Sequence, residues 1–149
     1  CCECYLMIKH LKDYVLDHEI SSTFVLNSID RIREVLSRSI DGLNIVGTSH
    51  PYFGVQVYGW QSPLPDHIDK TGYVFIMPIH ISTGTDRIIC ADTKCDLKVG
   101  HLYLLDDKRP HRTEGNGSVI ALFMGSYKAK ALNDDLYQRI FNEFTEYIN

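Results

Sequence analysis

The sequence predicts a mainly β domain, a jelly roll or closed antiparallel barrel, with helices packed outside it. Between residues 43 and 127, short runs rich in Val, Ile, Tyr and Phe alternate with Gly, Pro, Asn and Asp. The runs recur about every ten residues, a spacing typical of antiparallel strands joined by turns. Outside this region, apolar residues recur every three or four positions, as they do in amphipathic helices.

The N-terminal part, residues 5–40, is predicted to be helical. A first rough stripe within residues 5–17 consists of Leu6, Ile8, Leu11 and Val15. A second stripe follows an N-cap signal at residues 21–23 and consists of Val25, Ile29, Ile32, Leu36 and Ile40. Both stripes are predicted to face the core, and neither is assigned a binding role.

The central part, residues 44–127, is predicted to hold the strands of a β core. We expect them near residues 44–48, 53–60, 64–68, 73–82, 86–90, 95–98, 101–105, 110–114 and 118–127. A C-terminal helix over residues 134–148 is predicted by the cap signal at 133–135 and an apolar stripe that begins at Leu136. No linker or repeat interrupts the sequence, so residues 1–149 are expected to form one domain.

The composition of the chain indicates which kinds of partner and which cellular compartment to expect. A formal net charge of −4, with scattered Lys and Arg, gives no footprint for nucleic acid. No apolar run approaches the roughly 20 residues of a membrane span, so we expect no membrane partner. Five cysteines, an odd number, without a secretion signal favour a reduced, cytoplasmic protein. The Cys-Cys-Glu-Cys start is either a thiol-bearing end or a soft-metal ligand set.

A metal site is predicted from two short segments. His67 and Asp69 stand two residues apart on a predicted strand, where residues i and i+2 share one face. His111 opens a later strand directly after Pro110. Two histidines and one carboxylate occupy one face of a metal ion and leave its other positions open, as in non-haem Fe(II) oxygenases. Alternatively, His67 and Asp69 are surface strand residues and His111 merely follows a turn.

The same segments resemble the 2-oxoglutarate- and Fe(II)-dependent dioxygenases, especially their prolyl-hydroxylase branch. VQVYGWQSPLPDHID, residues 55–69, resembles the strand and His-X-Asp motif of that branch, and residues 101–127 resemble its second half, with a Pro-His turn before a final strand. The resemblance spans about residues 53–127. It implies a double-stranded β-helix of the cupin-like kind, with Fe(II), 2-oxoglutarate and O2, and with His67, Asp69 and His111 as catalytic metal ligands.

The resemblance also implies residues that bind the cosubstrate, with one departure. Tyr58 matches a tyrosine that hydrogen-bonds the cosubstrate, although a buried aromatic role is an equal alternative. Where the family places an Arg or Lys for the distal carboxylate, this sequence has Ser118 or its neighbours. A buried, unpaired carboxylate is costly, so a substitute is expected.

Three substitutes for the missing cation stand in the sequence. They are His80, Arg87 and Lys128. Each has a simpler reading, His80 as a satisfied core group and the other two as solvated charges. Arg112 is expected to face outward by strand alternation. Trp60 either walls the pocket or covers apolar surface.

Three functions fit these observations. The first is an oxygenase that hydroxylates a C–H bond, with a small-molecule cosubstrate and a peptide, amino-acid side chain or small metabolite as substrate. The second is a cupin-like metalloenzyme that does not use 2-oxoglutarate, or an oxygenase that uses another keto acid. The third is a non-catalytic binding module built on the same barrel.

Overall fold

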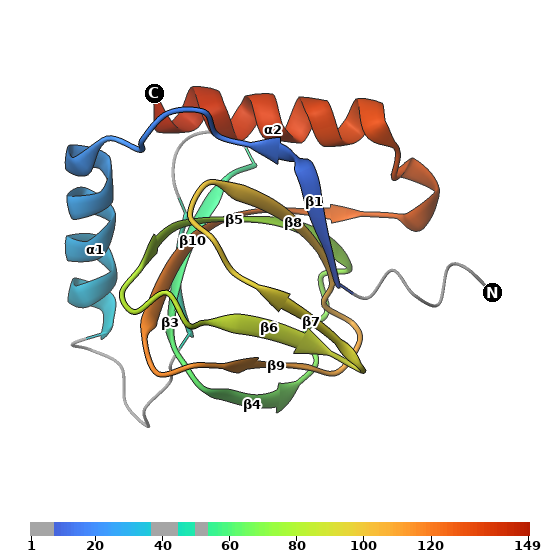
Figure 1. Cartoon of the computed structure of the whole chain (residues 1–149), viewed down its shortest axis with the longest axis horizontal. Helices are drawn as coiled ribbons and strands as arrows, with labels where there is room; N and C mark the ends of the chain where they lie inside the picture. Colours follow the sequence, from blue (N-terminus) through green and yellow to red (C-terminus); the bar gives the residue numbers. More distant parts are fainter. Residues whose placement is uncertain (1–7, 37–44, 50–53) are drawn as a thin grey trace.

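The computed structural model describes residues 8–36, 45–49 and 54–149, and within them ten strands and two α-helices (Figure 1). The helices are α1 (Ser22–Leu36) and α2 (Asp134–Ile148), and a short 3-10 turn, η2, spans Ala129–Ala131. The strands are β1 (Ile8–Val15), β2 (Ile45–Ser49), β3 (Gln56–Gln61), β4 (Leu64–His67), β5 (Tyr73–Ile81), β6 (Arg87–Cys90), β7 (Thr93–Asp96), β8 (His101–Asp106), β9 (His111–Glu114) and β10 (Ser118–Tyr127).

The strands form two facing antiparallel sheets. The larger has the order β1-β8-β5-β10-β3-β2 and the smaller the order β4-β9-β6-β7. From β3 to β10 the chain passes between the sheets in the winding of a double-stranded β-helix, and β1 and β2 extend the two edges of the larger sheet. The predicted fold class, a jelly roll with flanking helices, is confirmed.

The sequence of strand β5 is apolar at nearly every position because the strand is buried on both faces. Val74 and Ile76 belong to the cluster between the two sheets, whereas Phe75 and Met77 belong to a second cluster on the outer face of the larger sheet. Because successive side chains of a strand point to opposite faces, a strand buried on both faces needs an unbroken apolar run.

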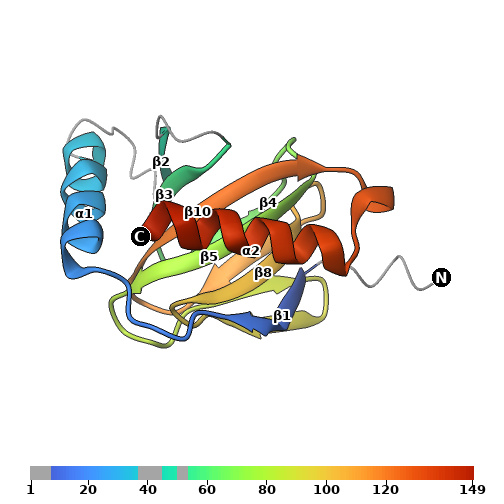
Figure 2. The ribbon, with the colours of Figure 1, turned by 90° about the horizontal axis from the view of Figure 1, so that it is seen from above.

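Helix α2 covers that outer face, as predicted for residues 134–148. The Asn133 side chain caps it by accepting a hydrogen bond from the Leu136 N–H at 2.9 Å. Its buried face, Tyr137, Ile140 and Phe144 among others, completes the second cluster. Figure 2 shows α2 lying across β5, β8 and β10.

The helix predicted over residues 5–17 is wrong, because residues Ile8–Val15 form strand β1 on the edge of β8. Ile8 packs into the cluster between the sheets and Leu11 into the cluster under α2. Residues three apart face opposite sides of a strand, so a strand buried on both faces can have the same spacing as a helical stripe. Pairing with β8 determines the outcome.

Helix α1 follows the predicted cap, and the Ser21 hydroxyl accepts a hydrogen bond from the Phe24 N–H at 3.4 Å. It packs on β3 where the strand carries Gly59, since a Cβ there would lie 2.9 Å from Ile32 Cγ2. The predicted continuation to residue 40 lies partly outside the described residues, as does the cysteine-rich start.

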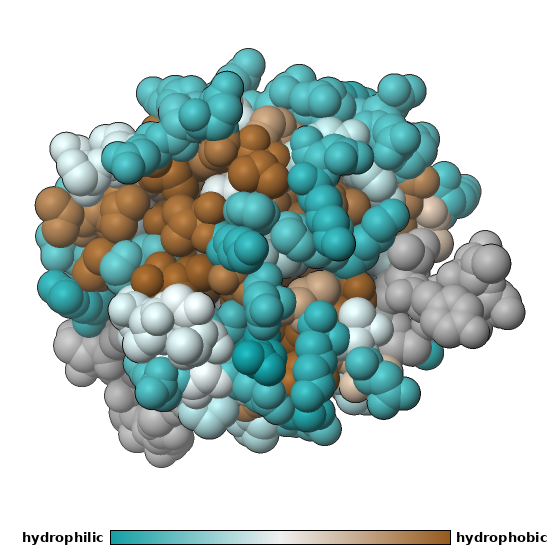
Figure 3. Space-filling model, in the orientation of Figure 1, coloured by the Kyte–Doolittle hydropathy of each residue, from teal (hydrophilic) through white to brown (hydrophobic). Residues whose placement is uncertain are grey.

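The surface is mostly polar in the view of Figure 3, with apolar atoms gathered on the side where α1 lies. Leu26 of α1 and Val99 before β8 are exposed apolar residues. Among the described residues, no helix combines the length and the apolar character needed to cross a membrane.

Candidate metal centre

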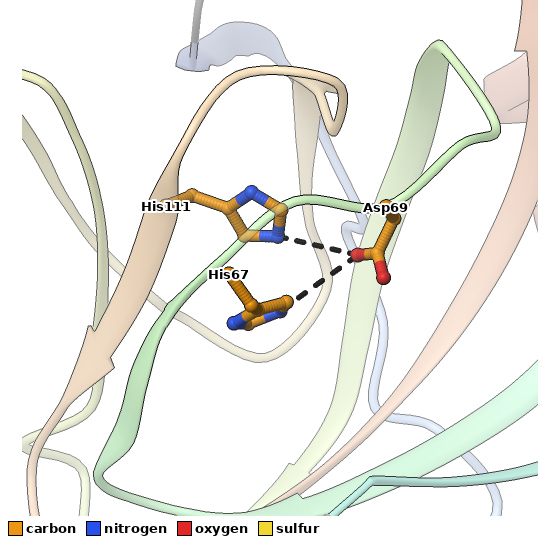
Figure 4. Close-up of side chains that lie close together, drawn as sticks. All are labelled: His67, Asp69 and His111. Atoms are coloured by element: carbon orange, nitrogen blue, oxygen red, sulfur yellow. Dashed lines mark ion pairs between the residues drawn. The ribbon is translucent and has the colours of Figure 1, made fainter.

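Two cross-strand neighbours form the core of the predicted site. His67 ends β4 and His111 begins β9, and the two residues pair directly across the smaller sheet. Their ring centroids lie 4.3 Å apart. Asp69 follows two residues after His67 and directs Oδ2 at both rings, 3.7 Å from His67 Nε2 and 3.4 Å from His111 Nε2 (Figure 4). The structure therefore brings the three predicted ligands together.

Each histidine is oriented by a backbone carbonyl two residues before it. The Nδ1–H of His67 donates to the Pro65 carbonyl at 2.8 Å, and the Nδ1–H of His111 donates to the Arg109 carbonyl at 2.8 Å. A carbonyl oxygen only accepts, so Nδ1 carries the proton in both rings. In neutral imidazoles this leaves a lone pair on each Nε2, which is the usual arrangement of metal-binding histidines.

Asp69 lies beyond the end of β4, and contacts with Asp107 hold its segment in place. The Asp69 N–H donates to the Asp107 carbonyl at 2.8 Å, and the Asp107 N–H donates to the Gly72 carbonyl at 3.1 Å. The buried Asp107 carboxylate accepts the Gly72 N–H through Oδ1 at 2.7 Å. Gly72 has a φ of +113°, which side-chain-bearing residues rarely adopt. These bonds fix Asp69 opposite the histidines.

The donor set fits a divalent transition metal. Two Nε2 lone pairs and a carboxylate oxygen converge, and all three ligand atoms lie within 4.8 Å of one another. Two ligand atoms that lie about 2.1 Å from one ion and at right angles to each other are about 3 Å apart. Small rotations of the three side chains would therefore bring their ligand atoms to the distances that a bound ion requires. Without a positive charge between them, three electron-rich atoms facing each other are unfavourable.

His67, Asp69 and His111 line the rim of a cavity of about 300 Å³ between the two sheets. The exposed fraction of the side chain is 50% for Asp69, 27% for His67 and 6% for His111, so the three candidate ligands differ in depth. The interior wall is apolar and is formed mainly by Trp60, Leu64, Val74, Ile76, Ile88 and Leu105. Trp60 therefore lines the cavity, which decides between its two predicted roles.

Tyr58 also lines the cavity, on the same face of β3 as Trp60. Its hydroxyl donates to Gln56 Oε1, and its ring meets Phe123 edge to face at 4.9 Å. Burial, and then the nearby negative charge of Asp69, raise the pKa of the Tyr58 hydroxyl, so it stays protonated and keeps its hydrogen bond to Gln56. A contact between Tyr58 and a cosubstrate stays a prediction.

The other four predicted cosubstrate residues do not line this cavity. Arg87 pairs with Asp96 at 3.4 Å and with Glu114 at 3.9 Å. The Ser118 hydroxyl donates to Gln61 Oε1 at 2.7 Å, and Lys128 is exposed ahead of η2. His80 pairs with Ile120 near the end of β5. None of these four residues therefore places a positive charge inside the cavity.

Among the cavity residues that were not foreseen, three polar ones bear on the site. Lys70, exposed at the rim directly after Asp69, is the only Lys or Arg among the described residues that line the cavity. Thr113 lies inside on β9, and Asp107 holds the Asp69 segment as described above. Of these three residues, only Lys70 had a signal in the sequence, because it directly follows the His-X-Asp motif.

Cys90 lies opposite His111 on β6 but has a different character. Its thiol is fully buried and contacts the Pro110 carbonyl at 3.5 Å. Burial raises the pKa of the Cys90 thiol to about 11, so the free thiol stays protonated near neutral pH.

Comparison with known proteins gave only distant structural likenesses. No family profile and no curated protein matches the chain. A cupin-2 domain protein from Shewanella frigidimarina is 10% identical over 69% of this chain and 99% of its own, with a TM-score of 0.44. An RmlC-like cupin from Desulfovibrio desulfuricans is 14% identical over 58% of this chain and 89% of its own, with a TM-score of 0.37.

The Escherichia coli ribosomal oxygenase YcfD is 14% identical over 73% of this chain and 29% of its own, with a TM-score of 0.33. Likenesses at this level assign neither a family nor an activity. None of them specifies the prolyl-hydroxylase branch that the sequence resembles.

Proposed function

We propose that this protein is a mononuclear non-haem Fe(II) oxygenase whose metal ligands are His67, Asp69 and His111. One observation carries the proposal: two histidines with fixed tautomers direct their Nε2 lone pairs, together with a carboxylate oxygen, at one point on the rim of an apolar cavity. Fe(II), when bound, supplies the binding and reductive activation of O2. Three protein ligands on one face leave positions for small molecules on the other.

The chain's own residues contribute orientation and exclusion of water. The carbonyls of Pro65 and Arg109 hold the two imidazoles in the ligating tautomer. The apolar walls keep water away from the interior side of the metal, and Tyr58, whose hydroxyl donates to Gln56 Oε1, lines the same cavity. Asp69, the most exposed ligand, faces the side from which a substrate can approach.

The proposed cosubstrate is a 2-oxo acid, and the sequence resemblance implies 2-oxoglutarate. In that reaction the 2-oxo acid loses CO2 as its keto carbon is oxidised to a carboxylate. One oxygen atom of O2 enters the new carboxylate and the other enters a C–H bond of the substrate. With 2-oxoglutarate the coproduct is succinate. A peptidyl or amino-acid side chain is the substrate class that we favour, on the resemblance alone.

A metalloenzyme that does not use 2-oxoglutarate is the second candidate. The absence of Arg and Lys from the interior wall formed by the described residues favours it. Both candidates need the same metal centre, so metal binding is tested first.

Anaerobic calorimetric titration with Fe(II) tests the metal centre. We expect one site per chain in the wild type, and loss of at least about a hundredfold in affinity in His111→Ala and Asp69→Asn. His18→Ala is the matched control, since His18 faces Asp17 at 2.9 Å on the exposed surface. Equal binding by the wild type and both site variants would falsify the proposal.

Oxygen consumption by the Fe(II)-loaded protein then separates the candidates. Consumption that depends on an added 2-oxo acid and releases CO2 supports the oxygenase. Metal binding with no consumption in the presence of any 2-oxo acid supports the second candidate.

A further inference from the structure

We infer that the cavity behind the metal centre selects a monocarboxylate with an uncharged, apolar tail, so that 2-oxoglutarate is a poor ligand for this chain. The inference rests on the proposed function, because it takes the metal as the group that holds the 2-oxo acid end. It replaces the dicarboxylate implied by the resemblance with a 2-oxo acid of another class.

The residues that form the interior wall of the cavity are mostly apolar and buried. Trp60, Leu64, Ile76 and Ile88 line the cavity and are each less than 10% exposed. A carboxylate moved into such surroundings without a cation costs several kcal/mol. An aliphatic or aromatic tail instead gains from leaving water, by about 0.8 kcal/mol per buried CH₂.

Two polar groups in this wall, the indole of Trp60 and the hydroxyl of Thr113, are neutral donors. The Trp60 indole N–H is buried and has no hydrogen-bond partner. The Thr113 hydroxyl accepts from the Leu64 N–H at 2.8 Å and from the Ser62 hydroxyl at 3.3 Å, which leaves its own proton to donate. Neutral donors suit a weak acceptor or a π-face on the ligand, but they do not replace the charge of a cation.

The basic residues of β6 and β9 are engaged in ion pairs, and Lys70 lies at the rim of the cavity. Arg87 pairs with Asp96 and Glu114, and Arg112 pairs with Glu114 at 3.4 Å. Lys70 is at the rim beside the metal ligand Asp69. We therefore assign Lys70 to the carboxylate next to the keto group, which every 2-oxo acid carries.

Cavity size agrees with a small ligand. A volume of about 300 Å³ is at the lower end of small-molecule sites. A short branched or aromatic tail fits this space better than a long chain.

The test compares two probes that differ only at the end of the tail, which is a carboxylate in one and an apolar isopropyl group in the other. In 5-methyl-2-oxohexanoate, two methyl groups stand where 2-oxoglutarate has its distal carboxylate oxygens. Each is titrated by calorimetry into the Fe(II)-loaded full chain under anaerobic conditions. We expect the apolar probe to bind at least about tenfold more tightly, because the dicarboxylate leaves a charge unpaired.

Binding of 2-oxoglutarate as tightly as the apolar probe, or more tightly, overturns the inference. Failure of both probes to bind a protein that does take up Fe(II) also overturns it, while the metal centre stands. Failure of Fe(II) uptake itself is a different result, which removes the proposed function.

Two variants sharpen the comparison. Lys70→Met should weaken both probes by a similar factor, up to roughly fivefold for an exposed ion pair. Weakening of 2-oxoglutarate alone would place Lys70 at the distal carboxylate and contradict the inference. Ile88→Lys, which adds a cation to the wall, should reverse the preference. If this variant does not fold, the wild-type comparison still decides.

Discussion

His67 and His111 are directly opposite residues of the neighbouring strands β4 and β9, and each presents Nε2 to the same oxygen of Asp69. Directly paired residues of an antiparallel sheet have Cβ atoms about 5 Å apart, close enough for two side chains to share one ion. The centre is therefore built into the register of the smaller sheet. A shift of one residue in that register would turn one of the rings to the opposite face.

Metal should stabilise the folded protein through these ligands. A ligand that binds only the folded state adds about 2.7 kcal/mol of stability when its concentration is a hundred times its Kd. We expect Fe(II), added under anaerobic conditions, to raise the melting temperature of the wild type and a chelator to reverse the change. Asp69→Asn should show little of either effect. An equal rise in the variant would assign the stabilisation to another site.

Asp107 should affect metal affinity without touching the metal. Asp107→Ala removes the acceptor of the buried Gly72 N–H, which costs about 1–3 kcal/mol of folding free energy. It also loosens the segment that presents Asp69, so we expect Fe(II) affinity to fall by roughly 10- to 100-fold. Asp107→Asn keeps an oxygen at the same place and should restore most of both quantities. Chemical denaturation and calorimetry measure them, and an unrestored Asn variant would contradict this role.

Gly115 should be intolerant of a side chain. It has a φ of +123°, and an added Cβ would lie 2.7 Å from Oδ1 of the buried Asp86. We expect Gly115→Ala to lower the free energy of unfolding by at least about 2 kcal/mol. Gly84→Ala is the control, since φ is +75° there and no atom lies within 4 Å of the added Cβ. Its expected cost is about 1–2 kcal/mol. Equal losses of unfolding free energy at the two positions would show that the Asp86 side chain moves away from the added Cβ at no energetic cost.

The pair His10 and His101 should make stability depend on pH. Their rings share a hydrogen bond of 2.9 Å between His10 Nε2 and His101 Nδ1, which joins β1 to β8. Burial lowers both pKa values, and the charges of His101, Lys12 and Lys98 lower that of His10 further. The folded state thus binds fewer protons than the unfolded one, so this stability is complete above pH 6.5, the ordinary histidine value, and is lost as pH falls through the lowered values.

Unfolding of the metal-free protein at pH 7.5 and pH 5 measures this effect. We expect His10→Gln to lose less stability between the two than the wild type does. Identical losses would mean that the pair does not titrate with folding.

Local patterns were sufficient to predict most of the fold. The Val- and Ile-rich runs located the strands, because alternation of side chains and turn residues are local properties. The prediction of a helix over residues 5–17 was wrong because Ile8 and Leu11 are buried on opposite faces of strand β1. The sheet that buries them is formed by residues distant in the sequence. A spacing of three residues does not distinguish these two cases.

The convergence of His67, Asp69 and His111 was predictable from the sequence, but the surroundings of the predicted cosubstrate residues were not. His67 and Asp69 are close in sequence, and the Pro-His turn identifies His111. Arg87 was a reasonable candidate for the missing cation, but its ion pairs with Asp96 and Glu114 depend on strand pairing that no local pattern reveals. The position of Asp69 beyond the end of β4, held by Asp107, was hidden for the same reason.

The most direct test of the metal centre is an anomalous-scattering map at the iron edge from crystals grown with Fe(II) in the absence of oxygen. We predict one strong peak per chain, about 2.0–2.2 Å from Nε2 of His67, Nε2 of His111 and an oxygen of Asp69. A peak elsewhere, or iron held by fewer than two of these three side chains, would contradict the account.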